Sequence, residues 1–231
     1  MRIFLLHGMG RSIASMAYLA WRLRQIGHQP TLFGYLVMTT DLQDIADRFA
    51  QKVQQVMAED DARLPAGESP PSYAVIGHSL GNVITRLASP HLVPGFSRFV
   101  MLAPPNHNPT VAGQLEGNKI FHFFTGDAGR KLASEDFYDQ LPVPDVPSII
   151  VAGTGGPRDP RLHLGDSAND GILTVEETRL DGIPLVEVNA IHTFLMNRTD
   201  VFELIRDFLA AADEDDPAAA VLAERASASV A

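Results

Sequence analysis

A serine lies between two glycines in the segment Gly77–Gly81, which reads Gly-His-Ser-Leu-Gly. A short apolar run, Tyr73–Ile76, precedes this segment, and apolar residues at helical spacing follow it over Leu80–Ala88. A G-x-S-x-G pattern between a strand and a helix is typical of a sharp turn that exposes the serine hydroxyl. Glycine is favoured on both sides of the serine because those positions crowd together in such a turn. We therefore predict that Ser79 is a nucleophile.

A serine hydroxyl becomes a good nucleophile only when a neighbouring base accepts its proton. His192 fits this role because it follows the last apolar run, Leu185–Val188. It should therefore emerge at the same edge of the sheet as Ser79. The other histidines fit less well, and those in irregular regions remain weaker alternatives: His107, His122 and His163.

The base in turn needs a carboxylate that fixes its tautomer and stabilises its protonated form. When the serine follows this strand–turn–helix pattern, the acid lies between the serine and the histidine along the chain. The polar stretch Gly153–Gly171 holds Asp159, Asp166 and Asp170. Asp170 is favoured because it lies late in this stretch and precedes a glycine that eases a turn, while Asp159 and Asp166 remain alternatives.

Acyl transfer also needs N–H donors for the negative charge that develops on the substrate oxygen. The N–H of Leu80 lies at the start of the predicted helix, where backbone donors are unpaired. A second donor is the N–H of Met9, in the segment His7-Gly8-Met9-Gly10 that follows the first apolar run, Ile3–Leu6. We therefore predict an oxyanion hole formed by Met9 and Leu80.

Apolar runs and helical patterns alternate along the chain, which indicates a parallel sheet with right-handed crossovers. Six strands are expected, at Ile3–Leu6, Thr31–Leu36, Tyr73–Ile76, Phe96–Ala103, Pro147–Ala152 and Leu185–Val188. Helices are expected from about Ser12 to Gly27, from the N-cap Asp41 to about Met57, over Leu80–Ala88, and from about Asp200 to Ala212. If the first and third strands are neighbours and the second lies outside the first, both glycine-rich motifs open onto one crevice.

The stretch 104–146 separates the fourth and fifth predicted strands and is too long for a plain crossover. We expect it to form a small cap over the site, with an apolar interior of Phe121, Phe123, Phe124, Phe137 and Tyr138. Residues 1–212 would then form one domain. The acidic, alanine-rich tail 213–231 is expected to be loosely ordered.

The chain has 231 residues and a formal net charge of −10, which argues against nucleic acid or an anionic membrane as a constitutive partner. It has no cysteine, and no apolar run approaches the roughly 20 residues that span a bilayer. The first predicted strand begins almost at Met1, which leaves no room for a signal peptide. We therefore expect a cytoplasmic protein without stable membrane insertion, and the oligomeric state stays open.

Four segments together resemble the α/β-hydrolase superfamily, in particular its small bacterial lipase and esterase branch: Leu6–Gly10, Gly77–Asn82, Asn169–Gly171 and Ile191–Phe194. The likeness extends from roughly Arg2 to Ala211. It implies a minimal α/β-hydrolase fold, with a mostly parallel six-stranded sheet, helices on both faces and a small cap insertion. It also implies a catalytic triad of Ser79, Asp170 and His192, and an oxyanion hole formed by the N–H groups of Met9 and Leu80.

The chain departs from that branch at two places. Asn82 stands where the branch usually has a second glycine. The segment Pro105-Asn106-His107-Asn108 stands where the branch has Pro-Asn-x-Gly. Neither change touches the implied triad, but the second would alter the acyl pocket.

The predicted reaction is serine-dependent hydrolysis of carboxylic esters through an acyl-enzyme, on a small-molecule or lipid-like ester with a hydrophobic acyl group. No cofactor and no metal are expected. Acyl transfer or thioester cleavage on the same fold are alternatives, and so is a non-catalytic protein that binds a ligand in the same pocket. The combined presence of Ser79, Asp170 and His192 favours an enzyme over a binding protein.

Overall fold

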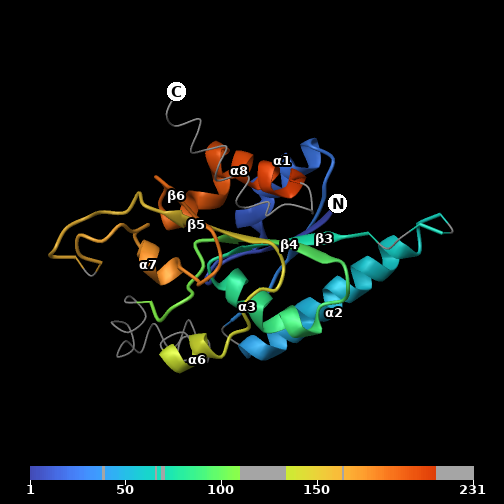
Figure 1. The fold of residues 1–231 in the computed structure, drawn as a ribbon, viewed down its shortest axis with the longest axis horizontal. Helices are drawn as coiled ribbons and strands as arrows, with labels where there is room; N and C mark the ends of the chain where they lie inside the picture. The colour runs from blue at the N-terminus through green and yellow to red at the C-terminus, as the bar shows by residue number, and fades with distance from the viewer. Residues whose placement is uncertain (38–39, 66, 69–70, 110–133, 163, 212–231) are drawn as a thin grey trace.

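The computed structural model describes residues 1–37, 40–65, 67–68, 71–109, 134–162 and 164–211. Within them, a six-stranded parallel sheet lies between helices on both faces (Figure 1). The strands are β1 (Arg2–Leu6), β2 (Gln29–Phe33), β3 (Tyr73–His78), β4 (Phe96–Leu102), β5 (Ser148–Gly153) and β6 (Leu185–Val188). The helices are α1 (Ala17–Gln25), α2 (Leu42–Asp61), α3 (Leu80–Ala88), α6 (Glu135–Asp139), α7 (Val175–Thr178) and α8 (Thr199–Ala210). Three short 3-10 helices are η1 (Ile13–Met16), η2 (Ser89–His91) and η3 (His192–Asn197).

The strands lie in the order β2-β1-β3-β4-β5-β6, so the direction of winding reverses between β1 and β3. This confirms the expected neighbours. Leu6 pairs with Gly77 at the carboxyl ends of β1 and β3. The two loops that follow these strands therefore leave the sheet side by side, at the switch point where open α/β sheets bind ligands.

Each face of the sheet has its own hydrophobic core. Phe4 and Val75 pack with α2 and α3 on one face. Ile3 and Ile76, their neighbours along the strands, pack with α1 and α8 on the other. Figure 1 shows α2 and α3 below the sheet and α1 and α8 above it. Because both faces are covered, the central strands are apolar at successive positions, which is why they read as continuous runs in the sequence.

Most element boundaries agree with the sequence to within a few residues, and β2 is the main exception. It covers Gln29–Phe33 rather than the expected Thr31–Leu36. Its ladder with β1 ends at the pair Leu6 and Phe33, because β1 itself ends there. The predicted N-cap of α2 is confirmed, since the carboxylate of Asp41 accepts a hydrogen bond from the N–H of Gln43 at 2.7 Å. That helix runs to Asp61, beyond the expected end.

Only part of the expected cap falls within the described residues. Residues 110–133, with Phe121, Phe123 and Phe124, lie outside them, and so does nearly all of the tail. The described part of the stretch 104–146 includes α6, whose Tyr138 is buried against the core on the α2 and α3 side. In the part of the chain that the structure describes, no helix combines the length and the apolar character needed to cross a bilayer.

Candidate active site

Ser79 lies between β3 and α3 in a strained backbone conformation. Its φ is 52° and its ψ is −121°, which residues with a side chain rarely adopt. Its N–H donates to the carbonyl of Leu102 on β4 at 2.9 Å, which holds the turn against the sheet. A Cβ added at Gly81 would lie 2.7 Å from the carbonyl oxygen of Leu6, so a side chain there would push α3 away from β1. The turn thus has the geometry that the sequence predicted.

The loop after β1 packs directly against this turn. A Cβ added at Gly8 would lie 3.0 Å from the Cβ of Ser79 and 3.0 Å from Nδ1 of His78. Met9 follows Gly8 and is partly buried against the core. Leu80 follows the serine and opens α3. The structure therefore brings the segments that carry the two predicted N–H donors together beside Ser79.

Asp170 and His192 are joined side chain to side chain. Nδ1 of His192 donates to Oδ2 of Asp170 at 2.7 Å, and the two side chains are 10% and 1% exposed. Because the ionised carboxylate can only accept, this bond places the ring proton on Nδ1 and leaves Nε2 as the acceptor. That is the tautomer a general base needs.

The backbone fixes the carboxylate and the histidine relative to each other. The N–H of His192 donates to the main-chain oxygen of Asp170 at 2.9 Å. The other carboxylate oxygen of Asp170 accepts from the N–H groups of Ile172 at 2.9 Å and Leu173 at 2.7 Å. A Cβ at Gly153, the last residue of β5, would lie 2.7 Å from the Cβ of Asp170, so glycine there lets this loop close over the strand.

His78 connects the serine turn to the histidine loop. Its side chain is fully buried, and its Nε2 bonds to the main-chain oxygen of His192 at 3.0 Å. The two imidazole rings lie 4.9 Å apart, centroid to centroid. Among the described residues, the hydroxyl of Ser79 makes no hydrogen bond to His192, and such contacts are often long until substrate binds. The sequence indicated no role for His78.

The competing acids and bases lie elsewhere. Asp159 is bound by Arg161, whose Nη2 lies 2.6 Å from its Oδ2, and this hydrogen bond lowers the pKa of the carboxyl group. Asp166 is exposed in a turn. His107 is exposed and lies 3.5 Å from a carboxylate oxygen of Glu135. The remaining alternatives, His122 and His163, lie outside the described residues.

Burial keeps the two histidines beside Ser79 neutral. Burial, followed by the nearby His192, holds the pKa of His78 well below its ordinary value. Burial also lowers the pKa of His7, against the opposing effect of its bond to the carbonyl of Gly8. Neither ring therefore competes for a proton near neutral pH. Among the described residues, no group of three or more His, Asp or Glu side chains is placed to hold a metal ion.

Asn82, one of the two departures from the resembled branch, reinforces the serine turn. Its side-chain Nδ2 donates to the main-chain oxygen of Ser79 at 3.0 Å and to that of Leu102 at 3.1 Å. The side chain is fully buried and lies over Gly77, where a Cβ would collide with it. A glycine at position 82 could make neither side-chain bond.

Asn106, in the second departure, is part of a buried polar network that ties the segment between β4 and β5 to α3. Nη1 of Arg86 donates to its Oδ1 at 2.9 Å, and its Nδ2 donates to the carbonyl of Thr178 at 2.8 Å. Arg86 also donates to the main-chain oxygens of Leu141 at 2.9 Å and Pro142 at 2.8 Å. Burial lowers the pKa of this arginine to about 10. Sequence patterns did not identify this network, because its members are far apart in the chain.

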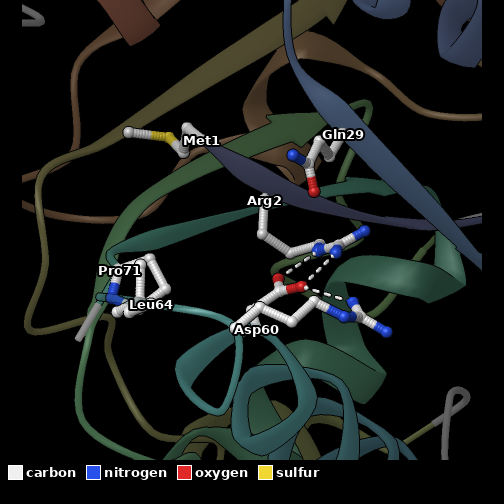
Figure 2. A pocket seen from close by; sticks show the side chains of 7 residues that line it. Met1, Arg2, Gln29, Asp60, Leu64 and Pro71 are labelled. Carbon is white, nitrogen blue, oxygen red and sulfur yellow. Dashed lines mark hydrogen bonds and ion pairs between the residues drawn. The ribbon is translucent and has the colours of Figure 1, made fainter. Parts of the chain in front are cut away.

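A separate cavity of about 300 Å³ lies at the opposite, amino edge of the sheet (Figure 2). It is lined by Met1, Arg2, Gln29, Asp60, Arg63, Leu64 and Pro71. Figure 2 shows the guanidinium of Arg2 directed at Asp60, and the shortest contact is 2.6 Å. Arg63 approaches the same carboxylate at 3.4 Å. Because these charges pair with one another, we assign no ligand to this cavity.

The fold is shared with solved lipases and esterases. The chain superposes on the mature lipase BlEst2 of Bacillus licheniformis with a TM-score of 0.64, 18% identity and 84% coverage of each chain. It superposes on the esterase EaEST of Exiguobacterium antarcticum with a TM-score of 0.64 and 15% identity, covering 91% of this chain and 92% of that one. For the phospholipase PlaB of Legionella pneumophila with thio-NAD, the TM-score is 0.61 at 22% identity, over 78% of this chain but only 44% of the phospholipase.

No family model matches the sequence, and no curated protein matches it. At sequence identities of 15% to 22%, the likeness to these solved structures shows the fold alone. The parallel six-stranded sheet, its strand order and the solved structures nonetheless agree. The chain therefore has the α/β-hydrolase fold.

Proposed function

We propose that this protein is a serine hydrolase that cleaves carboxylic esters through an acyl-enzyme on Ser79. The observation that carries the proposal is the 2.7 Å hydrogen bond between Asp170 and His192, at the sheet edge that also holds the strained serine. A buried carboxylate that orients a histidine near a partly exposed, strained serine is the arrangement that activates a hydroxyl for acyl transfer. The lipases and esterases that share the fold add support.

In the proposed first half-reaction, Nε2 of His192 accepts the proton of the Ser79 hydroxyl as its oxygen attacks the ester carbonyl. Asp170 stabilises the imidazolium that forms. The N–H groups of Met9 and Leu80 donate to the tetrahedral oxyanion. The intermediate collapses, the alcohol leaves with the proton from His192, and the acyl group stays on the serine.

In the second half-reaction, water attacks the acyl-enzyme. His192 accepts a proton from the water and returns it to the serine oxygen, which frees the carboxylic acid and restores the enzyme. The roles of Asp170, Met9 and Leu80 repeat those of the first step.

The surroundings of the site support a hydrophobic acyl group. Three large apolar side chains are exposed near the acid and the base: Ile172, Ile191 and Phe194. Ile191 and Phe194 flank His192 along the chain, and Ile172 follows Asp170 by two residues. Apolar side chains gathered at one place on a surface often mark a site of ligand contact. A lipid-like ester would cover them on binding.

A fluorophosphonate probe tests the proposal, because it reacts with activated serines. We expect it to modify Ser79 stoichiometrically, and Ser79→Ala to lose both labelling and hydrolysis of 4-nitrophenyl butyrate. Ser167→Ala, which alters an exposed serine in the polar loop before Asp170, is the matched control and should keep both. Labelling at another serine, with hydrolysis intact in Ser79→Ala, would refute the proposal. Binding of esters without any turnover would instead indicate a non-catalytic protein.

A further inference from the structure

A cavity of about 530 Å³ opens beside the loop that follows β1. Its polar lining consists of His7, Arg11, Ser12, Tyr35, Thr40 and Arg48. The two arginines come from different elements, one from the loop before η1 and the other from α2. None of the described residues that line it is an aspartate or glutamate, although the chain as a whole carries a net charge of −10. The cavity is therefore locally cationic.

Two guanidinium groups in this cavity are available to a ligand, and so is a hydroxyl. Within the described residues, the guanidinium groups of Arg11 and Arg48 take part in no hydrogen bond or ion pair, and neither does the hydroxyl of Ser12. The side chains of Tyr35 and His7 are occupied, and Thr40 adds a second hydroxyl to the lining. The hydroxyl of Tyr35 donates to the main-chain oxygen of His7, and both ring nitrogens of His7 contact main-chain groups, those of Gly8 and Tyr35. The ligand would thus meet two cations and the hydroxyls of Ser12 and Thr40.

The cavity adjoins the proposed site of reaction. His7 lines it, and the next residue, Gly8, packs against Ser79. The positive charge of Arg11 contributes to lowering the pKa of both His7 and His78, after burial in each case. Its guanidinium therefore lies within electrostatic range of the residue that precedes Ser79. A molecule bound at the serine could reach this cavity with a second group.

We propose that Arg11, Arg48 and Ser12 bind an anionic group, a carboxylate or a phosphate, carried by the ester that is cleaved at Ser79. This inference rests on the proposed function. Guanidinium groups suit the task because their planar set of donors matches the oxygens of both anions. Ile13 and Leu36 line the same cavity and are exposed, so the part of the substrate next to the anion is apolar. The substrate is accordingly an anionic amphiphile rather than a neutral ester.

The first test compares two esters of matched chain length, mono-4-nitrophenyl adipate and 4-nitrophenyl hexanoate, which differ by one terminal carboxylate. The ratio of their kcat/KM values measures the preference for the anion. In Arg11→Gln and in Arg48→Gln we expect this ratio to fall about tenfold, because each variant loses one charge-assisted hydrogen bond to the anion. Arg24→Gln is the control, because it makes the same change of charge on an exposed arginine in the last turn of α1. It should leave the ratio unchanged.

The second test measures binding without turnover, by calorimetry on the Ser79→Ala protein. Hexyl phosphate should bind more tightly than hexanol, and Arg11→Gln or Arg48→Gln added to Ser79→Ala should weaken its binding about tenfold. Inorganic phosphate and hexanoate, titrated separately, distinguish a site for the phosphate group itself from one for a carboxylate on an apolar chain.

The outcomes separate the two proposals. If no ester is cleaved but hexyl phosphate binding depends on both arginines, the anion site stands and the proposed hydrolase function fails. If esters are cleaved and neither arginine affects the ratio or the binding of hexyl phosphate, the anion site is wrong. An equal loss in Arg24→Gln would show a general charge effect and would also overturn the inference.

Discussion

Nε2 of His78 bonds to the main-chain oxygen of His192 at 3.0 Å, so the residue before the proposed nucleophile holds the backbone of the proposed base. The two histidines are 114 residues apart in sequence, and this bond joins the last residue of β3 to the first residue of η3. In the proposed mechanism, this bond would hold the imidazole of His192 in position to accept the proton of Ser79 while substrate enters and product leaves. His78 is thus a positioning residue in the proposed mechanism.

His78→Phe should reduce kcat about tenfold with a smaller change in KM, because it removes one hydrogen bond worth about 1 kcal/mol and leaves the carbonyl of His192 unpaired. His78→Gln keeps a side-chain N–H donor and should recover part of the loss. Steady-state kinetics and melting temperatures of both variants check this. If both variants melt lower but retain wild-type kcat, His78 serves stability alone.

Asp170→Asn should lower kcat by roughly 10⁴, since losing the carboxylate of a triad disturbs the tautomer and the charge of the base. The protein should stay folded and still label slowly at Ser79. Asp159→Asn and Asp166→Asn are the matched controls and should remain close to wild type, because one pairs with Arg161 and the other is exposed. If Asp159→Asn is inactive and Asp170→Asn is active, the carboxylate of the triad is misassigned.

Gly8→Ala should lower kcat about 10²-fold, because its Cβ would press on both Ser79 and His78 at 3.0 Å and shift the loop that carries Met9. Gly10→Ala is the control in the same loop. Its φ is +66°, so alanine there is strained, but no heavy atom lies within 4 Å of the added Cβ. We expect it to cost stability with little effect on kcat. Equal losses of kcat would indicate that loop conformation, rather than contact with the serine, limits the rate.

The free energy of unfolding should fall as the pH drops below about 6.5, the ordinary pKa of histidine. The folded protein holds the pKa of buried His78 and His7 below that value, so the unfolded chain binds protons that the folded chain does not. Each such group contributes a slope of up to about 1.4 kcal/mol per pH unit. Urea unfolding from pH 5 to pH 8 measures the slope.

The matched comparison for this slope is between two histidine variants. His78→Phe should flatten the pH dependence of unfolding, because it removes a group that the folded state keeps neutral. His91→Gln, at the end of η2 and away from the buried site, should leave it unchanged. If the slope is the same in all three proteins, protonation of His78 does not contribute to it.

The sequence by itself determined the serine turn and the sheet. The turn is local, since Gly77, Ser79 and Gly81 encode their own backbone geometry within five residues, and the strands on either side follow from short apolar runs. The strand order was also predictable, because parallel crossovers have one favoured hand and the motifs had to share one edge. The end of β2 could not be predicted from the sequence, because it depends on where its partner β1 ends.

Tertiary structure decided which side chains from distant loops meet. Three aspartates shared one polar stretch, and only the path of the chain past Gly153 brings Asp170 rather than Asp159 to His192. The bond from His78 to His192 and the network around Arg86 likewise join residues with no periodic or spacing signal between them. Arg11 and Arg48 line one cavity because β1 and α2 pack side by side, a relation between elements that no local pattern encodes.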